Sequence, residues 1–285
     1  MMKIAIPNKG RLAEGAVDLL QRAGLRVEGR SERALQASLG NGFTALFVRA
    51  RDIPEFVADG AADAGITGLD VVEEMGRELD LLLDLEYGRC RLVVAAQEDG
   101  VADVSALPEG TRVATAFPRL ARRFFGARDL PVEIVPVSGA AEIAPHIGVA
   151  DVIVDLVSTG STLKTNGLRE VATVLESTAR LVARAPEGND EIINRKLREL
   201  VPALESVLRA RDKRYLMANV PRSALDQVSR ILPGLSGPTV VDLVDSTLVA
   251  THAVVDTADV YRVIADLKEI GASGILVTKI ERLMP

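Results

Sequence analysis

The chain has 285 residues, of which 48% are hydrophobic and 26% charged, and its formal net charge is −6. This composition excludes a disordered chain and argues against a nucleic-acid partner, because binding to the phosphate backbone needs clustered Lys and Arg. The sequence lacks an apolar run of the roughly 20 residues that a membrane helix needs, and its first residues do not resemble an export signal. We therefore expect a cytoplasmic protein of several domains, with no membrane partner.

The first ninety residues alternate apolar strands with amphipathic helices. Strands are predicted at residues 2–6, 43–48 and 62–67. Helices are predicted after the first strand, over 52–59, and from Val71, where Asp70 is the expected N-cap and Glu73 completes a capping box. Such alternation favours a parallel or mixed sheet that is covered by helices.

The pattern repeats and then changes near residue 211. A second set of strands is predicted at 91–96, 112–116, 132–135 and 151–157, before a long helix over 189–211. The remaining elements are strand 215–220, helix 221–232 with Pro221 at its first position, strands 239–244 and 248–255, helix 258–270, and a strand from residue 275. This βαββαβ order is ferredoxin-like and predicts a separate C-terminal domain.

The stretch most informative about function is 151–163, where an apolar strand runs into a loop of small hydroxyl residues around Gly160. Backbone N–H groups and hydroxyls of such a loop can converge on a phosphate, and a glycine permits close approach. The loop consists of Ser158, Thr159, Gly160, Ser161, Thr162 and Leu163. The alternative is an ordinary solvent-exposed turn.

Two acids lie on the strand before this loop. Asp151 and Asp155 are four residues apart, so both point to the same face of a strand. Asp155 lies at the carboxyl end, where open α/β sheets bind ligands, and can hold ribose hydroxyls or a magnesium-bound pyrophosphate. Asp151 is more simply explained as a strand-start acid that faces water.

A second candidate site combines residues 8–11, which include Lys9, Gly10 and Arg11, with Arg49. Both segments follow strand ends, so their cations can meet in one cleft and neutralise phosphates. A solvated helix surface is the better explanation for three other arginines, which are Arg51, Arg122 and Arg123.

The turn over residues 65–70 contains Gly65 and Gly68 and is a place where a flat base could approach the backbone. A strand-to-helix turn needs nothing more than this, however. His146 and His252 have no ligand partners at the spacing of a metal motif, so zinc is not expected.

Four separated motifs, at residues 7–12, 65–68, 157–163 and 221–225, together resemble the ATP phosphoribosyltransferase family in its long form. The resemblance covers the whole chain in order. It implies transfer of the phosphoribosyl group of phosphoribosyl pyrophosphate (PRPP) to N1 of ATP, the first step of histidine biosynthesis, with Mg²⁺ and with inhibition by histidine. It also implies assembly into dimers and hexamers.

The resemblance further implies a fold and a set of site residues. The catalytic half would be two-lobed and similar to type II periplasmic-binding proteins, with one lobe from residues 1–90 and 185–210 and the other from 91–184. Residues 211–285 would form an ACT-like regulatory domain.

The family's functional residues map onto this sequence by motif. PRPP would be bound by Asp155 and residues 158–163, with Asp155 also a possible Mg²⁺ ligand and, with Arg49, catalytic. ATP would be bound by Lys9, Gly10, Arg11, Arg49, Thr67, Gly68 and Asp70. Histidine would be bound by Asn219, Leu235, Ser236, Thr239, Val254 and Gly274.

Two other functions use parts of the same pattern. A two-lobed protein can capture a small ligand without catalysis. An amino-acid-sensing regulator built on the C-terminal domain would leave Lys9, Arg49 and residues 155–163 without a purpose.

Overall fold

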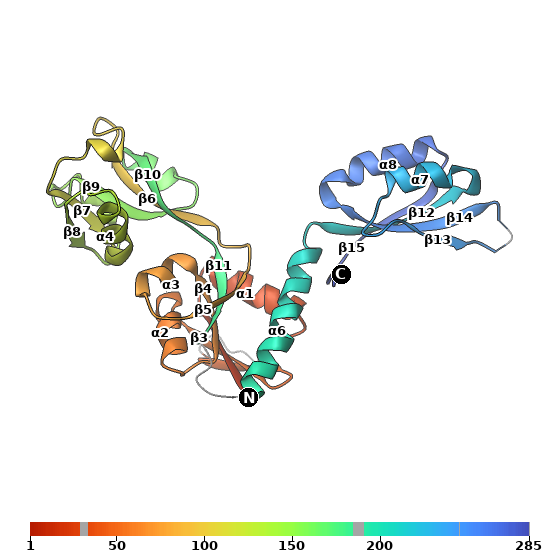
Figure 1. The fold of residues 1–285 in the computed structure, drawn as a ribbon, viewed down its shortest axis with the longest axis horizontal. Helices are drawn as coiled ribbons and strands as arrows, with labels where there is room; N and C mark the ends of the chain where they lie inside the picture. Colours follow the sequence, from red (N-terminus) through yellow and green to blue (C-terminus); the bar gives the residue numbers. More distant parts are fainter. Residues whose placement is uncertain (29–33, 185–190, 245, 285) are drawn as a thin grey trace. The chain divides into compact units, whose positions relative to one another are not determined.

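The structure is a computed structural model that describes residues 1–28, 34–184, 191–244 and 246–284 (Figure 1). It divides into two compact units, Met1–Val201 and Pro202–Pro285. The N-terminal unit contains two sheets with helices packed on them, and the C-terminal unit contains one.

The first lobe of the N-terminal unit has a sheet of six strands in the order β2-β3-β1-β4-β11-β5. Its strands are β1 (Met2–Pro7), β2 (Gln36–Gly40), β3 (Phe43–Val48), β4 (Ala64–Gly68), β5 (Asp80–Asp84) and β11 (Ala179–Ala183). Its helices are α1 (Arg11–Arg22), the 3₁₀ turn η1 (Ala50–Asp52), α2 (Ile53–Ala58) and α3 (Leu69–Met75). Strand β1 is parallel to both β3 and β4, so these three strands end at the same edge of the sheet.

The second lobe has a sheet of five strands in the order β10-β6-β9-β7-β8. Its strands are β6 (Cys90–Gln97), β7 (Thr111–Thr115), β8 (Val132–Pro136), β9 (Val152–Val157) and β10 (Leu168–Ser177). Its helices are α4 (Pro118–Gly126) and α5 (Ser161–Thr165), with 3₁₀ turns η2 (Val104–Ala106) and η3 (Ala141–Ile143). The apolar face of α4, with Leu120, Phe124 and Phe125, is buried in the core beside Val113 and Val154.

The two lobes share one strand order. In each sheet, three parallel strands are followed by a strand that arrives from the other lobe and runs antiparallel, which is β11 in the first lobe and β6 in the second. The chain therefore crosses between the lobes twice, after β5 and after β10. This arrangement confirms the two-lobed fold of the periplasmic-binding-protein type.

The C-terminal unit confirms the ferredoxin-like βαββαβ order, with the strands arranged β13-β14-β12-β15. Its elements are β12 (Lys213–Pro221), η4 (Arg222–Ala224), α7 (Leu225–Ile231), β13 (Thr239–Asp242), β14 (Leu248–Asp256), η5 (Thr257–Asp259), α8 (Val260–Glu269) and β15 (Ser273–Lys279). Helices α7 and α8 cover one face of the sheet (Figure 1). The helix α6 (Glu191–Ala210) contains the boundary between the two units.

Three local expectations are wrong. Helix α3 has Gly68 at its N-cap, and Asp70 lies inside the helix with its side chain bonded to Ser177, so the predicted capping box does not form. Pro221 is not the first residue of a helix. It is the last residue of strand β12, and the 3₁₀ turn η4 separates it from α7. The return to the first lobe occurs earlier than residue 185, since Ala179–Ala183 already pairs with β4.

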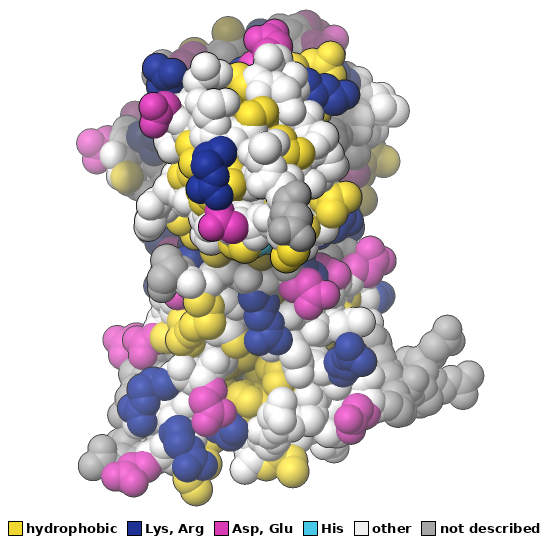
Figure 2. All heavy atoms as spheres, turned by 90° about the vertical axis from the view of Figure 1, so that its right-hand side faces the viewer, with side chains coloured by type: hydrophobic (Ala, Val, Ile, Leu, Met, Phe, Trp, Pro, Cys, Tyr) yellow, Lys and Arg dark blue, Asp and Glu magenta, His cyan; other side chains and the backbone are white. Residues whose placement is uncertain are grey.

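The surface shown in Figure 2 mixes side chains of both signs. Basic and acidic groups alternate with hydrophobic ones on the described residues of this face, rather than one sign gathering there. An extended basic surface, of the kind that binds a nucleic-acid backbone, is therefore not seen on this part of the described surface. No helix among the described residues is long and apolar enough to cross a membrane.

Candidate active site

The hydroxyl-rich loop surrounds a cavity of about 310 Å³ at the carboxyl end of β9. The cavity is lined by the loop of the second lobe, by Asp155 and Glu142, and by Arg11 of the first lobe. Its walls are mainly polar and include one cationic side chain, Arg11, which is the chemistry that a phosphate group needs. The structure therefore brings all the residues predicted for PRPP except Ser161 to the wall of one cavity.

The backbone of the loop turns at its single glycine. Gly160 has a φ of 79°, in the left-handed region, and helix α5 begins at the next residue. The Thr159 and Ser161 hydroxyls are 3.0 Å apart and hydrogen-bonded, which fixes the turn. Leu163 is buried in the core of the second lobe and anchors α5, so its contribution to binding is to hold the loop in place.

An ion pair supports the loop from behind. Arg91 at the start of β6 and Glu170 on β10 pair through Nη1 and Oε2 at 2.9 Å. The Glu170 carboxylate lies 3.6 Å from the position that a Cβ on Gly160 would take. Neither residue was expected from the sequence, because the two are distant in the chain and only the sheet brings them together.

Asp155 combines partial burial with a free carboxylate oxygen. Its Oδ1 accepts a hydrogen bond from the N–H of Leu156 at 2.8 Å. Burial raises the pKa of the Asp155 carboxyl above its usual range, the Leu156 hydrogen bond opposes this shift, and the negative charge of Glu142 raises the pKa further. Glu142, which the sequence analysis did not identify, lies on η3 and reaches the same cavity.

Arg11 joins the two lobes at this cavity. Its Nη2 donates to the Ser158 hydroxyl at 2.8 Å. We expected Arg11 to belong to the nucleotide part of the cleft, but its side chain lies with the phosphate loop. Lys9 and Gly10 instead line a separate hollow along α1.

The other first-lobe candidates lie at one edge of the first sheet. Arg49 follows β3 and is exposed, and Thr67 and Gly68 end β4 and are buried. The Thr67 hydroxyl donates to the carbonyl of Ala50 at 2.8 Å, which fixes the end of β4 to the segment that carries Arg49. Because β1, β3 and β4 are parallel, Lys9 belongs to this same edge.

Asp70 is buried, and its carboxylate lies against Gly68 at the end of β4. Its carboxylate accepts a hydrogen bond from the Ser177 hydroxyl at 2.5 Å, where the chain crosses back between the lobes. Burial raises the pKa of Asp70, and the Ser177 hydrogen bond opposes the shift. The side chain therefore supports the crossing segment, and a role of Asp70 in binding ATP stays a prediction.

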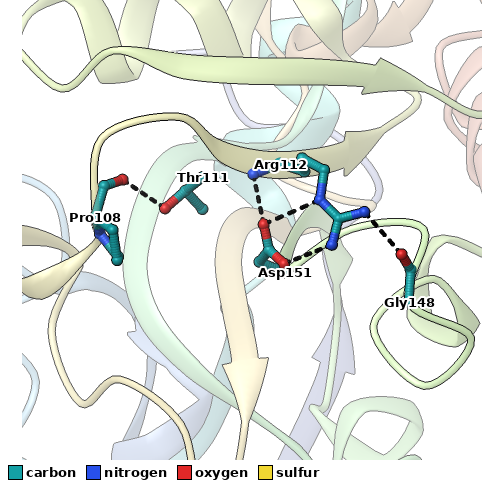
Figure 3. A network of polar contacts seen from close by, with 5 residues as sticks. All are labelled: Pro108, Thr111, Arg112, Gly148 and Asp151. Carbon is teal, nitrogen blue, oxygen red and sulfur yellow. Dashed lines mark hydrogen bonds and ion pairs between the residues drawn. The ribbon is translucent and has the colours of Figure 1, made fainter.

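Asp151 has the structural role that was favoured for it (Figure 3). Its carboxylate accepts hydrogen bonds from the backbone N–H and the guanidinium of Arg112, which also donates to the Gly148 carbonyl. This ion pair lowers the pKa of Asp151. The hollow of about 450 Å³ beside it contains Glu109 and Asp151 but no Lys or Arg among its lining residues, so it is not suited to a phosphate.

Two of the three arginines expected on solvated helix surfaces are exposed and also contact the other lobe. Arg123 of α4 pairs with Glu73 of α3 at 2.7 Å, and Arg51 donates to the Ala116 carbonyl at 3.1 Å. Sequence spacing could not reveal these partners, because each pair joins segments from different lobes. Arg122 is exposed, as expected.

The residues predicted for histidine lie in two places in the C-terminal unit. Leu235 and Val254 line a small hollow of about 100 Å³. A Cβ on Gly274 would lie 3.1 Å from the Asn219 amide nitrogen, so these two residues adjoin elsewhere, on β12 and β15. Strand register places Asn219, Thr239 and Val254 on the face of the sheet opposite α7 and α8, and Ser236 is exposed in the loop before β13.

The fold and the cavity define a two-lobed α/β protein whose second lobe carries a polar cavity, with a cation supplied by the first lobe. Comparison with known proteins identifies the family within this class. Residues 49–206 match the family model described as ATP phosphoribosyltransferase, and residues 210–282 match the model described as HisG, C-terminal domain.

Whole-chain relatives carry the same name. The chain is 59% identical to an ATP phosphoribosyltransferase of Gemmatimonas aurantiaca, with 100% of both chains covered. It is 50% identical to one of Haloarcula marismortui, with 99% of this chain and 100% of that one covered. A solved ATP phosphoribosyl transferase (HisG:HisZ) complex from Thermotoga maritima matches at 31% identity and a TM-score of 0.61, over 72% of this chain and 99% of that one. The chain belongs to the ATP phosphoribosyltransferase family.

Proposed function

We propose that this chain joins the 5-phosphoribosyl group of PRPP to N1 of the adenine of ATP, releasing pyrophosphate, as the first step of histidine biosynthesis. The observation that carries the proposal is the left-handed Gly160 loop at the end of β9, with Arg11 of the other lobe bonded to Ser158. A mixture of protein, ATP, PRPP and Mg²⁺ tests it. A new N1-ribosylated adenine chromophore should form, and omission of any one component should prevent it.

The reaction needs positioning and electrostatics more than a covalent catalyst. N1 of adenine attacks C1 of the ribose as pyrophosphate leaves, and positive charge develops on the sugar ring. The loop would hold the 5′-phosphate through its backbone N–H groups and hydroxyls. Asp155 would hold the ribose hydroxyls or face the cationic sugar, and Arg49 would neutralise the leaving pyrophosphate. N1 of neutral adenine already has a lone pair, so the mechanism assigns no general base.

The acids in the cavity fit Mg²⁺ that is shared with the substrate. Mg²⁺ is usually held by one or two carboxylates together with substrate phosphates and water, and Asp155 and Glu142 provide two carboxylates at one wall. The described residues contain no cluster of three or more His, Cys, Asp or Glu that could hold a metal unaided. When bound, the ion would neutralise negative charge on the pyrophosphate.

The non-catalytic alternative predicts ligand binding without product. A two-lobed binding protein would bind PRPP or ATP alone, and the chromophore would not form. The whole-chain identity to ATP phosphoribosyltransferases supports the enzyme instead.

Thr162 should contribute to PRPP affinity through its hydroxyl. Thr162 is exposed at the first turn of α5 and lines the cavity. Thr162→Ala should weaken PRPP binding by about 1 to 3 kcal/mol, the range expected for one charge-assisted hydrogen bond. Calorimetric titration with PRPP measures this. Thr165→Ala is the matched control, because Thr165 lies on the same short helix and its hydroxyl donates to the Ser161 carbonyl. Equal affinities in the two variants would remove Thr162 from the site.

Histidine inhibition is proposed to act through the C-terminal unit. Leu235 lies in a loop, whereas Asn219 and Val254 lie on the sheet face opposite α7 and α8, so we propose that histidine binds where copies of the chain meet and favours one assembly over another. Such inhibition is allosteric if two assembled states bind histidine unequally. A dimer and a hexamer are the two states that we propose.

Gly274→Leu should make the enzyme insensitive to histidine while its basal turnover stays near wild type. The Cβ of the new side chain would lie 3.1 Å from the Asn219 amide nitrogen, and the rest of the side chain would fill that part of the site. Inhibition curves for histidine at fixed PRPP provide the measurement. Gly271→Leu is the control for backbone strain. Gly271 lies in the same unit and also has a positive φ, which is 84° at Gly271 and 57° at Gly274. Full histidine sensitivity in a folded Gly274→Leu enzyme would place the inhibitor elsewhere.

A further inference from the structure

Helix α4 of the second lobe is capped by a carboxylate from the first lobe. Its N-cap residue is Phe117, whose apolar side chain cannot accept a hydrogen bond, so the free N–H groups of the first turn need another acceptor. Glu74 of α3 supplies it. Glu74 Oε1 accepts from the Arg119 N–H at 3.0 Å and Oε2 accepts from the Leu120 N–H at 2.9 Å.

This contact is electrostatically favourable as well as geometrically matched. A carboxylate that accepts two N–H groups at a helix N-terminus gains charge-assisted hydrogen bonds and interacts with the positive end of the helix dipole. Glu73 adds an ion pair to Arg123, 2.7 Å long, one turn further along α4. Gly76 leaves room for the Arg119 guanidinium, which a Cβ at residue 76 would overlap.

The N-terminal end of α4 is also contacted by the first-lobe segment that carries Arg49, a candidate catalytic residue. Arg51 donates to the carbonyl of Ala116, directly before the α4 N-cap, at 3.1 Å. Arg49 is two residues from Arg51, and the Thr67 hydroxyl bonds to Ala50 between them. Contact between α3 and α4 therefore sets how closely the Arg49 segment approaches the second lobe.

We propose that Glu74 is a positioning residue for phosphoribosyl transfer, which fixes the two lobes at the spacing where Arg11 and Arg49 act on a substrate held by the second lobe. The inference rests on the proposed function. Separation of the lobes would leave the N-terminus of α4 without these acceptors, so the arrangement in this structure is stabilised by a contact that does not involve substrate. Glu74 is expected to influence the chemical step more than the affinity for PRPP, because all the residues that line the PRPP cavity except Arg11 belong to the second lobe.

The first test compares Glu74→Gln with Glu78→Gln in the full chain. The amide introduced by Glu74→Gln keeps the size of the side chain but loses the charge and one acceptor, whereas Glu78 is exposed four residues further on. We expect Glu74→Gln to lower kcat by about tenfold or more with a PRPP KM within about threefold of wild type, the pattern of a lost transition-state contribution. Glu78→Gln should match wild type.

The second readout measures the lobe spacing independently of activity. Spin labels at Gln36→Cys on β2 and Glu133→Cys on β8, in a Cys90→Ser background, report the distance between the lobes. Glu74→Gln should broaden this distribution toward longer distances. An unchanged distribution in Glu74→Gln would overturn the proposal, whether or not kcat falls. An inactive wild-type enzyme would overturn the proposed function instead, while the distances still test the contact.

A charge swap keeps the test valid if Glu74 variants do not fold. Glu73→Arg and Arg123→Glu each place like charges together and should broaden the distance distribution and lower kcat. The double variant restores an ion pair with reversed polarity and should recover both. Failure of the double variant to recover either quantity would count against functional contact between α3 and α4.

Discussion

Gly160→Val should abolish phosphoribosyl transfer while leaving the fold intact. Gly160 has a φ of 79°, a conformation that a β-branched residue adopts only with strain, so the loop must move away from its phosphate-binding geometry. Each preorganised donor lost from a charged site costs about 10² to 10³ in rate, and several would be displaced together. We therefore expect turnover to fall below detection in a coupled pyrophosphate assay.

Gly110→Val controls for backbone strain in this experiment. Gly110 has a φ of 76° and open space around it, but lies in the hollow at the far end of the same sheet. A comparable stability loss in both variants, with activity lost only in Gly160→Val, is the expected pattern. Near-normal turnover in folded Gly160→Val protein would contradict the assigned phosphate loop.

Arg49→Ala should lower kcat/KM by about 10² or more, because the loss removes a cation that stabilises charge on the leaving pyrophosphate. Arg49 is exposed at the carboxyl end of β3, free to meet a ligand, while Thr67 fixes the adjacent backbone. Lys9→Ala should have a smaller effect, since Lys9 lies beside a different hollow. Steady-state kinetics with both substrates, and titration with histidine, provide the measurements.

Arg122→Ala is the matched control for Arg49→Ala. Arg122 is an exposed arginine of the same N-terminal unit that lies on α4 and not at the carboxyl end of β3, where Arg49 lies. Its kinetics should equal those of wild type. Histidine affinity should be unchanged in all three variants, and a fall in histidine affinity parallel to the loss in nucleotide affinity would mean that the two sites are not separate.

The fold was largely predictable because its elements are locally encoded. Strand Phe43–Val48 has the predicted bounds, and the βαββαβ order after residue 211 follows from hydrophobic spacing and turns. Strands β2, β5, β10 and β11 were missed. Among these, β10 carries charged residues along a mostly half-buried strand, and β5 has two exposed residues followed by three half-buried ones, so neither shows clean alternation. Their place in the sheets depends on pairing with distant strands, which local patterns do not contain.

The candidate site was predictable only where one segment carries it. Residues 155–163 could be recognised because strand, glycine and hydroxyls are consecutive. Glu142, Glu74 and the partners of Arg11 and Arg123 could not, since each contact joins elements from separate parts of the chain. Asp70 was assigned as a cap because its spacing to Glu73 fits a capping box, but burial beside Ser177 determined its orientation instead.

The central claim is tested most directly by identifying the products that purified enzyme makes from ATP and PRPP with Mg²⁺. The account predicts one pyrophosphate released for each molecule of N1-(5-phosphoribosyl)-ATP formed, with all of this activity lost in Gly160→Val and retained in Gly110→Val. Saturable binding of ATP and PRPP to the folded wild-type chain without either product would contradict it.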